Sequence, residues 1–311
     1  MNLPAVLGSR WPVAARRQGR PVAAAYLALT KPRIIELLLV TTVPTMVVAA
    51  RGLPNGWLVL ATLVGGSLAA GGANAINMVV DRDIDRLMAR TRGRPLVTGE
   101  ITPAAALVFA IVLEVVAFAE LALAVNLLSA VLALSAMLFY VFVYTMWLKR
   151  TSSQNIVIGG AAGAVPTLVG WAAVTGHLAL APVVLFAVIF LWTPPHFWAL
   201  ALRYRDDYAA AEVPMLPVVA SFDRTARQIV IYTVALWGAT LVFGAVAGMG
   251  VLYWVAAVVL GGVFLTNALR LQRDGTPARS MRLFGWSITY VTLLFGAMAA
   301  DTLLRAALGR A

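Results

Sequence analysis

The sequence GWLVLATLVGGSLAAGGANAINMVVDRDIDRLMARTRGRPL, residues 56–96, decides the fold class. Residues 56–79 contain no charged side chain, and as a helix they are long enough to cross the ~30 Å hydrocarbon core of a bilayer. Residues 81–94 then hold three aspartates and five arginines. This pattern predicts a transmembrane helix that ends in an unusual mixture of both charges at one membrane face.

The rest of the chain has the same character. Of its 311 residues, 61% are hydrophobic and only 12% are charged, which indicates an all-α polytopic membrane protein. Cysteine is absent, so disulfides and thiolate metal sites are excluded. Nine transmembrane helices are predicted, at roughly 34–50, 56–79, 103–124, 127–147, 155–175, 179–202, 228–248, 250–269 and 282–304.

Lysines and arginines predict the orientation. With the N-terminus cytoplasmic, 21 of the 24 basic residues fall on the inner side of the nine spans. The net charge of +11 is therefore attributed to membrane topology, and no nucleic-acid partner is expected. Residues 1–25 are predicted to be a basic cytoplasmic tail, and residues 26–311 a single intramembrane domain.

Asn77, Asp81 and Asp85 are spaced i, i+4, i+8, so on a helix they lie on one face. Carboxylates stacked in this way repel each other unless Mg²⁺ or arginine lies between them. The structural alternative is a salt-bridged helix end, with Asp81 pairing with Arg82 or Arg86. A functional role is favoured because the acids begin while the helix is still inside its apolar span, where unpaired charge is costly.

The helix exit continues as arginines. Gly93 and Pro95 end the helix, so Arg90, Arg92 and Arg94 are expected on a loop beside the carboxylates. Carboxylates that hold Mg²⁺, next to arginines that bind oxyanions, form a site suited to a diphosphate.

A second polar region follows the sixth span. Pro194 and Pro195 are predicted to break or kink that helix, and His196 follows them inside the membrane. The structural alternative for such a histidine is an interhelical hydrogen bond. Asp206 and Asp207 lie about ten residues further on, on the inner side, so the two acidic regions are expected to converge on one cavity.

Four more charged residues have two open interpretations. Lys149 and Arg150 end the fourth span, as interface anchors or as ligands of phosphate oxygens. Glu114 and Glu120 lie within the third span and face different sides of it, and they are expected to be either protonated or paired, with no partner identifiable from the sequence.

The pattern N-x-x-x-D-x-x-x-D at residues 77–85 resembles the first aspartate motif of the UbiA-like intramembrane prenyltransferases. With LTKPRI, YTMWLKR, NIVIGGAAGAVPTLVGW, WTPPHFWALAL and DDYAAAEVPMLPVV, it is similar to the branch of this family that acts on haem. The resemblance covers residues 26–220. It implies a nine-helix bundle around a central cavity, covered on the cytoplasmic side. It also implies transfer of the farnesyl group of farnesyl diphosphate to a vinyl group of haem B, with water addition that gives haem O.

The resemblance also implies residue roles. Asp81 and Asp85 would hold Mg²⁺ with support from Asn77, and His196 would position haem or water. Haem B is a substrate here, not a cofactor. The remaining candidates would bind the diphosphate or the haem propionates: Arg90, Arg92, Arg94, Lys149, Arg150 and Asp207. Arg203 stands where the wider family has the first acid of a second motif, so a second metal ion is not expected.

Two rival functions are considered. One is the same chemistry on a quinone or chlorin acceptor, and the other is an ion-coupled transporter. The favoured function implies a protein of the cytoplasmic (inner) membrane whose active site faces the cytoplasm. A haem A synthase or another haem-handling membrane protein is the expected partner.

Overall fold

The computed structural model describes residues 20–309, with the side chains of residues 33–39 outside the description, and within that range the chain forms helices and no strand. The long helices are α2 (Pro32–Ala50), α3 (Gly56–Val80), α6 (Pro103–Glu120), α7 (Leu127–Leu138), α9 (Asn155–Thr175), α10 (Leu180–Arg203), α13 (Phe222–Val246), α14 (Val251–Asp274) and α15 (Pro277–Ala307). The short helices are α1 (Val22–Thr30), α4 (Arg82–Leu87), α5 (Pro95–Thr98), α8 (Lys149–Thr151), α11 (Arg205–Ala210) and α12 (Leu216–Val219). Two π-helical segments, η1 (Leu121–Val125) and η2 (Phe139–Leu148), continue α6 and α7.

Eight helical segments of the described chain are long and apolar enough to cross a membrane, and they correspond to eight predicted spans. The helix α13 begins at Phe222 rather than near 228, because Ser221 caps it and accepts a hydrogen bond from the Arg224 N–H. The predicted span 34–50 falls on α2, whose described apolar stretch is the shorter Val40–Ala50. This span stays a prediction, and most of the predicted N-terminal tail lies outside the described residues.

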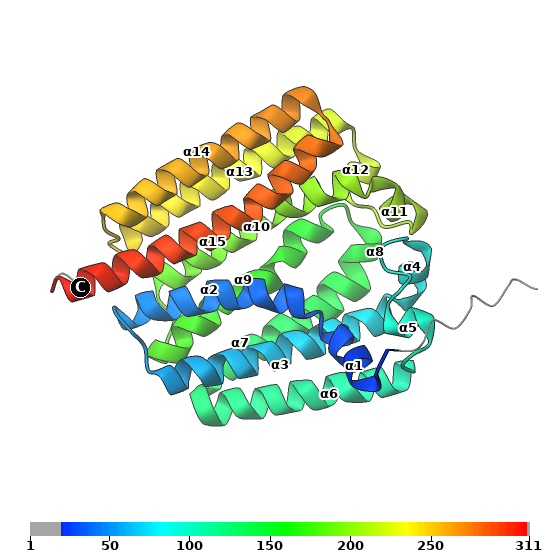
Figure 1. Cartoon of the computed structure of the whole chain (residues 1–311), viewed down its shortest axis with the longest axis horizontal. Coiled ribbons are helices and arrows are strands. Elements are labelled where there is room, and N and C mark those ends of the chain that lie inside the picture. The colour runs from blue at the N-terminus through cyan, green and yellow to red at the C-terminus, as the bar shows by residue number, and fades with distance from the viewer. Residues whose placement is uncertain (1–19, 310–311) are drawn as a thin grey trace, which may run out of the picture.

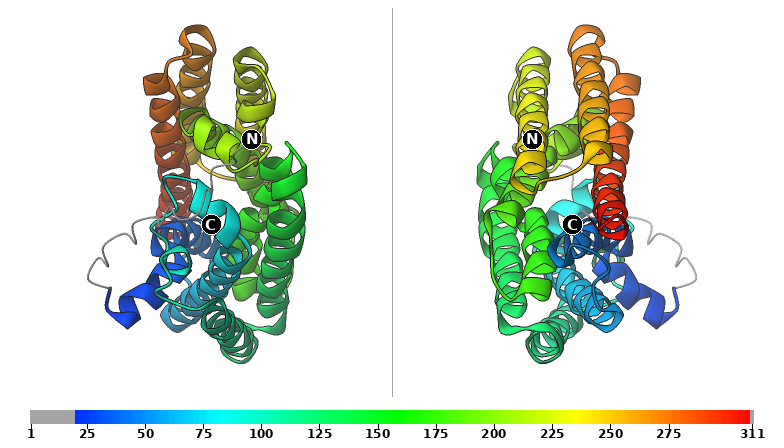
Figure 2. Two further views of the ribbon diagram at one scale, coloured as in Figure 1. Left: turned by 90° about the vertical axis from the view of Figure 1, so that its right-hand side faces the viewer. Right: turned by 90° about the vertical axis from the view of Figure 1, so that its left-hand side faces the viewer.

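The long helices run roughly along one direction (Figure 1). The helices α13, α14 and α15 lie along one side of the bundle and α3 and α6 along the opposite side, with α9 and α10 between them (Figures 1 and 2). This arrangement places segments from both halves of the sequence around a common interior.

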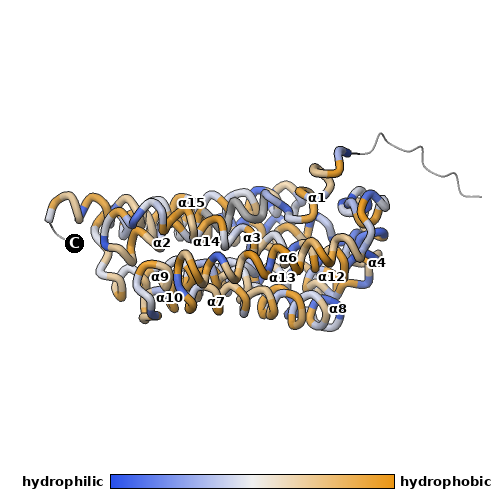
Figure 3. Tube along the Cα trace, turned by 90° about the horizontal axis from the view of Figure 1, so that it is seen from below, coloured by the Kyte–Doolittle hydropathy of each residue, from blue (hydrophilic) through white to orange (hydrophobic). Residues whose placement is uncertain are grey.

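The short helices α4, α5, α8, α11 and α12 gather at one end of the bundle (Figure 1). Hydrophilic residues are concentrated at that end, around α4 and α8, whereas the long helices are mostly hydrophobic (Figure 3). The two long connections, 80–102 and 203–221, therefore meet at the same end. The two loop regions lie together, but neither Asp206 nor Asp207 belongs to the described lining of the cavity at this end, so the expected convergence of both acidic regions on one cavity is not observed.

The two intramembrane glutamates of α6 both pack against glycines of α3, so the prediction that they face different sides of their helix is wrong. A Cβ atom on Gly72 would lie 2.6 Å from Glu114 Oε1, and one on Gly65 would overlap Glu120 Oε2. The glycines thus provide the space that the carboxyl groups fill. Glu114 Oε1 and Glu120 Oε2 have no hydrogen-bond partner among the described residues. Within the described part of the chain, both glutamates therefore have packing contacts but no ion pair.

Of the break or kink predicted at Pro194 and Pro195, the break is not observed. The helix α10 continues from Leu180 to Arg203 through both prolines. Both prolines are buried, and α10 contacts α9, α13 and α15 along its length. Packing on several sides holds the segment helical although the prolines lack two backbone donors.

Candidate active site

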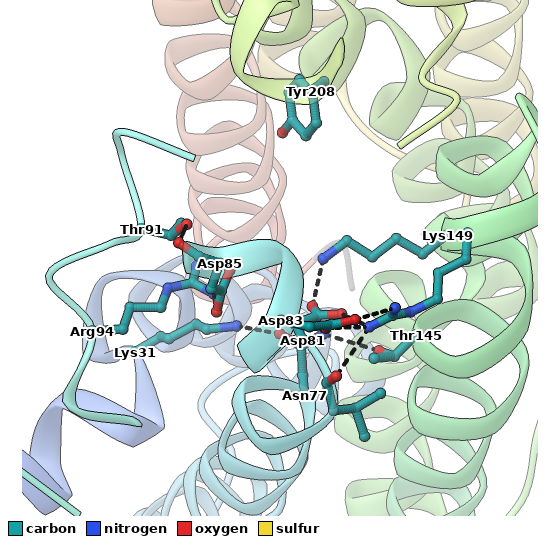
Figure 4. Close-up of polar contacts among 12 residues, drawn as sticks. Lys31, Asn77, Asp81, Asp83, Asp85, Thr91, Arg94, Thr145, Lys149 and Tyr208 are labelled. Carbon is teal, nitrogen blue, oxygen red and sulfur yellow. Dashed lines mark hydrogen bonds and ion pairs between the residues drawn. The ribbon is translucent and has the colours of Figure 1, made fainter. Parts of the chain in front are cut away.

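The predicted carboxylate face is present where α3 passes into α4. The Asp81 N–H donates to Asn77 O at 2.9 Å and the Asp85 N–H donates to Asp81 O at 2.9 Å, so helical hydrogen bonding continues across the junction. Asn77, Asp81 and Asp85 are 3%, 0% and 2% exposed. The spacing i, i+4, i+8 therefore gathers two buried carboxyl groups and an amide on one side of the helix (Figure 4).

Asp81 lies at the centre of a hydrogen-bond network. Its Oδ2 accepts hydrogen bonds from Asn77 Nδ2 at 2.8 Å and from Lys149 Nζ. Asn77 Nδ2 also donates to Thr145 Oγ1 at 3.0 Å. The other oxygen of Asp81, Oδ1, is buried without a hydrogen-bond partner among the described residues, and Arg150 Nη2 lies 3.9 Å from it. A buried carboxylate oxygen with no donor is available to a cation.

Asp85 is held from the loop that follows it. Arg94 Nη1 donates to Asp85 Oδ2 at 2.6 Å, and Thr91 Oγ1 donates to the Asp85 carbonyl at 2.9 Å. The predicted arginine-rich exit thus turns back on the carboxylates, and of its three arginines Arg94 is the one that contacts an acid of the cluster.

Lys31 completes the cluster from the start of the described chain. It adopts a left-handed conformation, with φ of 52°, between α1 and Pro32 of α2. Its Nζ donates to Asn77 Oδ1 at 2.7 Å (Figure 4). Burial, together with the nearby charges of Arg94 and Lys149, lowers the Lys31 pKa to about 7. Three cations thus surround two carboxylates at this point.

Arg150 hydrogen bonds to a different carboxylate, that of Asp83. Both of its terminal nitrogens donate to Asp83, each at 2.7 Å, and Nη2 also donates to the Val80 carbonyl at 3.0 Å. The hydrogen bonds from Arg150 lower the pKa of Asp83 to about 2. Asp83 points away from the cluster, as the helical spacing predicts, and its exposed pair with Arg150 joins α4 to the end of η2 and α8.

A cavity of about 360 Å³ opens beside the cluster. Its walls include small residues of α3, α7 and α9, among them Gly66, Ala133 and Gly163. The aromatic rings of Tyr140 and Tyr144 also line it and stack on each other at 5.4 Å. Lys31, Asn77, Asp85, Arg94 and Lys149 belong to the same lining. The cavity is therefore apolar along the helices and charged at the end that holds α4.

Arg90 lies at the charged end of this cavity but on a different surface. Its guanidinium carbon is 5.6 Å from the ring centre of Tyr204 and 5.8 Å from that of Tyr208, and its Nη2 donates to the Tyr208 hydroxyl at 3.3 Å. Tyr208, on α11, lies apart from the carboxylates (Figure 4). Arg90 therefore connects the loop after α3 with the one after α10.

Five predicted site residues lie outside the described lining of the cavity: Asp81 and Arg150, whose contacts are given above, and Arg92, Asp207 and His196. Arg92 is exposed on its loop, and Asp207 is half-buried on α11. His196 is buried against α15, where its Nδ1 lies 2.7 Å from Ser287 Oγ and its ring stacks on Trp192 at 4.2 Å. This surrounding matches the structural alternative for His196, an interhelical contact.

Sequence reasoning assigned no site role to Lys31, Thr145, Tyr140, Tyr144 or Tyr208. Lys31 lies in LTKPRI, one of the segments that carry the family resemblance, and Thr145 lies in YTMWLKR. The tyrosines at 140 and 144 share the spacing i, i+4, and η2 presents both of them to the cavity. π-Helical turns occur frequently at functional sites.

The carboxylates fit a metal ion that takes few of its ligands from the protein. Within the described chain, no group of three or more His, Cys, Asp or Glu side chains could form an all-protein cage. Mg²⁺ usually takes one or two carboxylates, with water and phosphate oxygens as its other ligands. Asp81 and Asp85, with the unbonded Asp81 Oδ1, fit that mode of binding.

Comparisons with known proteins match most of the chain. Residues 38–295 match the model of the UbiA prenyltransferase family. A relative from Clavibacter michiganensis subsp. michiganensis, named protoheme IX farnesyltransferase, is 54% identical over 90% of this chain and 92% of its own length. A relative from Saccharopolyspora erythraea, named protoheme IX farnesyltransferase 1, is 56% identical over 91% of each chain.

Solved structures show the same fold. One described as digeranylgeranylglyceryl phosphate synthase has a TM-score of 0.75 at 16% identity, and covers 91% of this chain and 99% of its own. A UbiA homologue from Archaeoglobus fulgidus, bound to GPP and Mg²⁺, has a TM-score of 0.64 at 19% identity, with coverage of 89% and 99%. With the eight apolar helices, these matches indicate a multi-pass membrane protein.

Proposed function

The chain belongs to the UbiA prenyltransferase family, and from this premise we propose that it transfers the farnesyl group of farnesyl diphosphate to a vinyl group of haem B. The observation that carries the choice of substrates is the identity of 54–56% to relatives named protoheme IX farnesyltransferase, over nine-tenths of the chain. Neither the quinone or chlorin acceptor nor the transporter has a comparable observation in its favour.

The diphosphate binds at the buried cluster. Asp81 and Asp85 hold Mg²⁺, which supplies positive charge to the phosphate oxygens when it is bound. Asn77 hydrogen bonds to Asp81 and keeps its carboxylate in place. A UbiA homologue with the same fold binds GPP and Mg²⁺, and this supports the assignment.

Lys31, Arg94 and Lys149 neutralise the leaving group. Each already lies against a member of the carboxylate–amide cluster, at the charged end of the cavity. Cations fixed in this way stabilise the negative charge that develops on the diphosphate as its bond to the allylic carbon breaks. The farnesyl chain extends into the apolar part of the cavity, which excludes water from the allylic cation.

Aromatic rings face the region where that cation forms. Tyr140, Tyr144 and Trp192 line the cavity, and their π faces stabilise a nearby positive charge. The carbon–oxygen bond of farnesyl diphosphate breaks and its electron pair leaves with the diphosphate. The π electrons of a haem vinyl group form the new carbon–carbon bond to the allylic carbon, which leaves the positive charge on the vinyl carbon attached to the porphyrin. Water then adds to the cation next to the porphyrin and loses a proton, which gives the hydroxyl group of haem O.

The cellular setting follows from the charge distribution. With 21 of 24 basic residues on one side of the predicted spans, the cluster faces the cytoplasm from the cytoplasmic membrane. Residues 26–311 act as one intramembrane domain. Because haem O is an intermediate for oxidase haem, a haem A synthase or another haem-handling membrane protein is the partner to which product passes.

The test uses the full chain purified in lipid nanodiscs. Incubation with haem B, farnesyl diphosphate and Mg²⁺ is expected to give haem O, identified by its mass. Omission of Mg²⁺ should abolish product formation. Prenylation of a quinone precursor, with no product from haem B, would contradict the proposed acceptor.

A further inference from the structure

Arg90 differs from the other cations of the site in position and in partners. We propose that Arg90, supported by Tyr204 and Tyr208, binds a carboxylate of the acceptor, a haem propionate, and does not bind the diphosphate. The proposal rests on the proposed function, and it assigns separate anionic groups to two sets of basic residues.

The inner set is already committed to the carboxylate cluster. Lys31 donates to Asn77, and Arg94 and Lys149 pair with Asp85 and Asp81. A diphosphate that shares a metal ion with Asp81 and Asp85 must lie within contact distance of these three cations. The charge requirement of the diphosphate is therefore met without Arg90.

Arg90 is instead held by the second loop region. Its guanidinium lies over the rings of Tyr204 and Tyr208 at 5.6 and 5.8 Å, and one hydrogen bond of 3.3 Å reaches the Tyr208 hydroxyl. Among the side chains that the structure describes, no acid forms an ion pair with Arg90. Arg90 is thus a cation at the cavity edge with aromatic support and no carboxylate partner.

This environment suits a carboxylate ligand. A guanidinium has five N–H donors in one plane, and a position over aromatic rings leaves most of these donors available at its edge. Two parallel hydrogen bonds to one carboxylate are the geometry that arginine forms most readily. Tyr204 and Tyr208 orient the plane before the ligand arrives, which reduces the side-chain entropy lost on binding.

The surroundings of Arg90 suit the rest of the acceptor. Met88, Val213 and Met215 line the same end of the cavity as Tyr208 and offer apolar contact to a flat macrocycle. The cavity, at about 360 Å³, is near the lower end of the ~300–1,000 Å³ typical of sites for one drug-sized ligand. It suits the farnesyl chain alone, so the porphyrin lies at the opening where Arg90 stands.

The experiment compares haem B with its dimethyl ester, in which both propionates are neutral. The variants are Arg90→Gln, Arg90→Lys and, as the matched control, Arg86→Gln, which changes an exposed arginine of α4 outside the described cavity lining. Arg90→Gln is expected to raise the KM for haem B about tenfold, with the KM for farnesyl diphosphate within about twofold of the unmodified protein. For the dimethyl ester, Arg90→Gln and the unmodified protein should be equal. Arg90→Lys should recover part of the loss, and Arg86→Gln should match the unmodified protein.

Two results would overturn the assignment. One is a rise in the KM for farnesyl diphosphate, which would move Arg90 to the diphosphate. The other is an equal loss with haem B and with the ester, which would make its role structural. Failure of the proposed function gives a different result, because the unmodified protein then forms no prenylated haem. Spectrophotometric titration of each variant with haem B and with the ester still tests Arg90 in that case.

Discussion

Replacement of Asp81 by asparagine, compared with the same change at Asp83, tests the carboxylate cluster most directly. Asp81 is fully buried, pairs with Lys149 and accepts a hydrogen bond from Asn77. The side chain of Asp83 is 63% exposed, and its pair with Arg150 is a surface contact. The two acids lie two positions apart, so a general effect of lost charge in this loop would affect both variants.

The expected magnitudes differ by orders of magnitude. Loss of a carboxylate that holds Mg²⁺ removes several kcal/mol, about 3–5, of transition-state charge stabilisation. At about 1.4 kcal/mol per factor of ten, this predicts that Asp81→Asn lowers kcat/KM for farnesyl diphosphate between about a hundredfold and a few thousandfold. An exposed pair contributes about 0–1 kcal/mol, so Asp83→Asn should cost less than about fivefold.

The assay is formation of haem O by purified protein in nanodiscs, with the thermal unfolding temperature measured in parallel. A double-mutant cycle with Lys149→Met adds a check, because loss of both partners should be less than additive. An Asp81→Asn variant within about fivefold of the unmodified protein would refute the reasoning. Equal losses for Asp81→Asn and Asp83→Asn would refute it as well.

Three further predictions address other parts of the site. Only protonated Lys31 attracts an anion, and its pKa is about 7, so kcat/KM for farnesyl diphosphate should fall as the pH rises through about 7. The Lys31→Arg variant should lack this fall. Identical pH profiles for the variant and the unmodified protein would contradict the role of Lys31. Gly163 lines the cavity, and a Cβ atom there would meet nothing within 4 Å, so a larger side chain can project into the cavity. Gly163→Leu should therefore raise the ratio of kcat/KM for geranyl diphosphate to kcat/KM for farnesyl diphosphate. An unchanged ratio would contradict binding of the farnesyl chain along this wall of the cavity. His196 packs on Trp192 and contacts Ser287. His196→Gln should therefore lower the unfolding temperature and leave kcat within about threefold of the unmodified protein. A larger fall in kcat at an unchanged unfolding temperature would restore the catalytic role predicted from sequence.

The sequence was sufficient for the bundle and for the core of the site, for a physical reason. Eight membrane-spanning segments follow from hydrophobic length, and Asn77, Asp81 and Asp85 are brought together by helix geometry alone. Arg94 was also predictable because it lies nine residues after Asp85, on the loop that turns back.

The remaining features depend on contacts between distant segments. Lys31 is 46 residues from Asn77, and Lys149 is 68 residues from Asp81. No periodicity relates such pairs. The side of α10 on which His196 lies is set by its packing on α15, so the residue type and its depth in the membrane did not reveal its environment.

The pairing of each cation in the cluster has a consequence for turnover. Arg94 and Lys149 pair with Asp85 and Asp81, and on the proposed function we expect these pairs to re-form when the diphosphate leaves. Departure of the leaving group is therefore an exchange of partners, in which re-formed ion pairs offset the contacts that are lost. A site that held the same cations without these acids would bind inorganic diphosphate more tightly and release it more slowly. On the proposed function, the two aspartates would therefore limit product inhibition as well as promote binding.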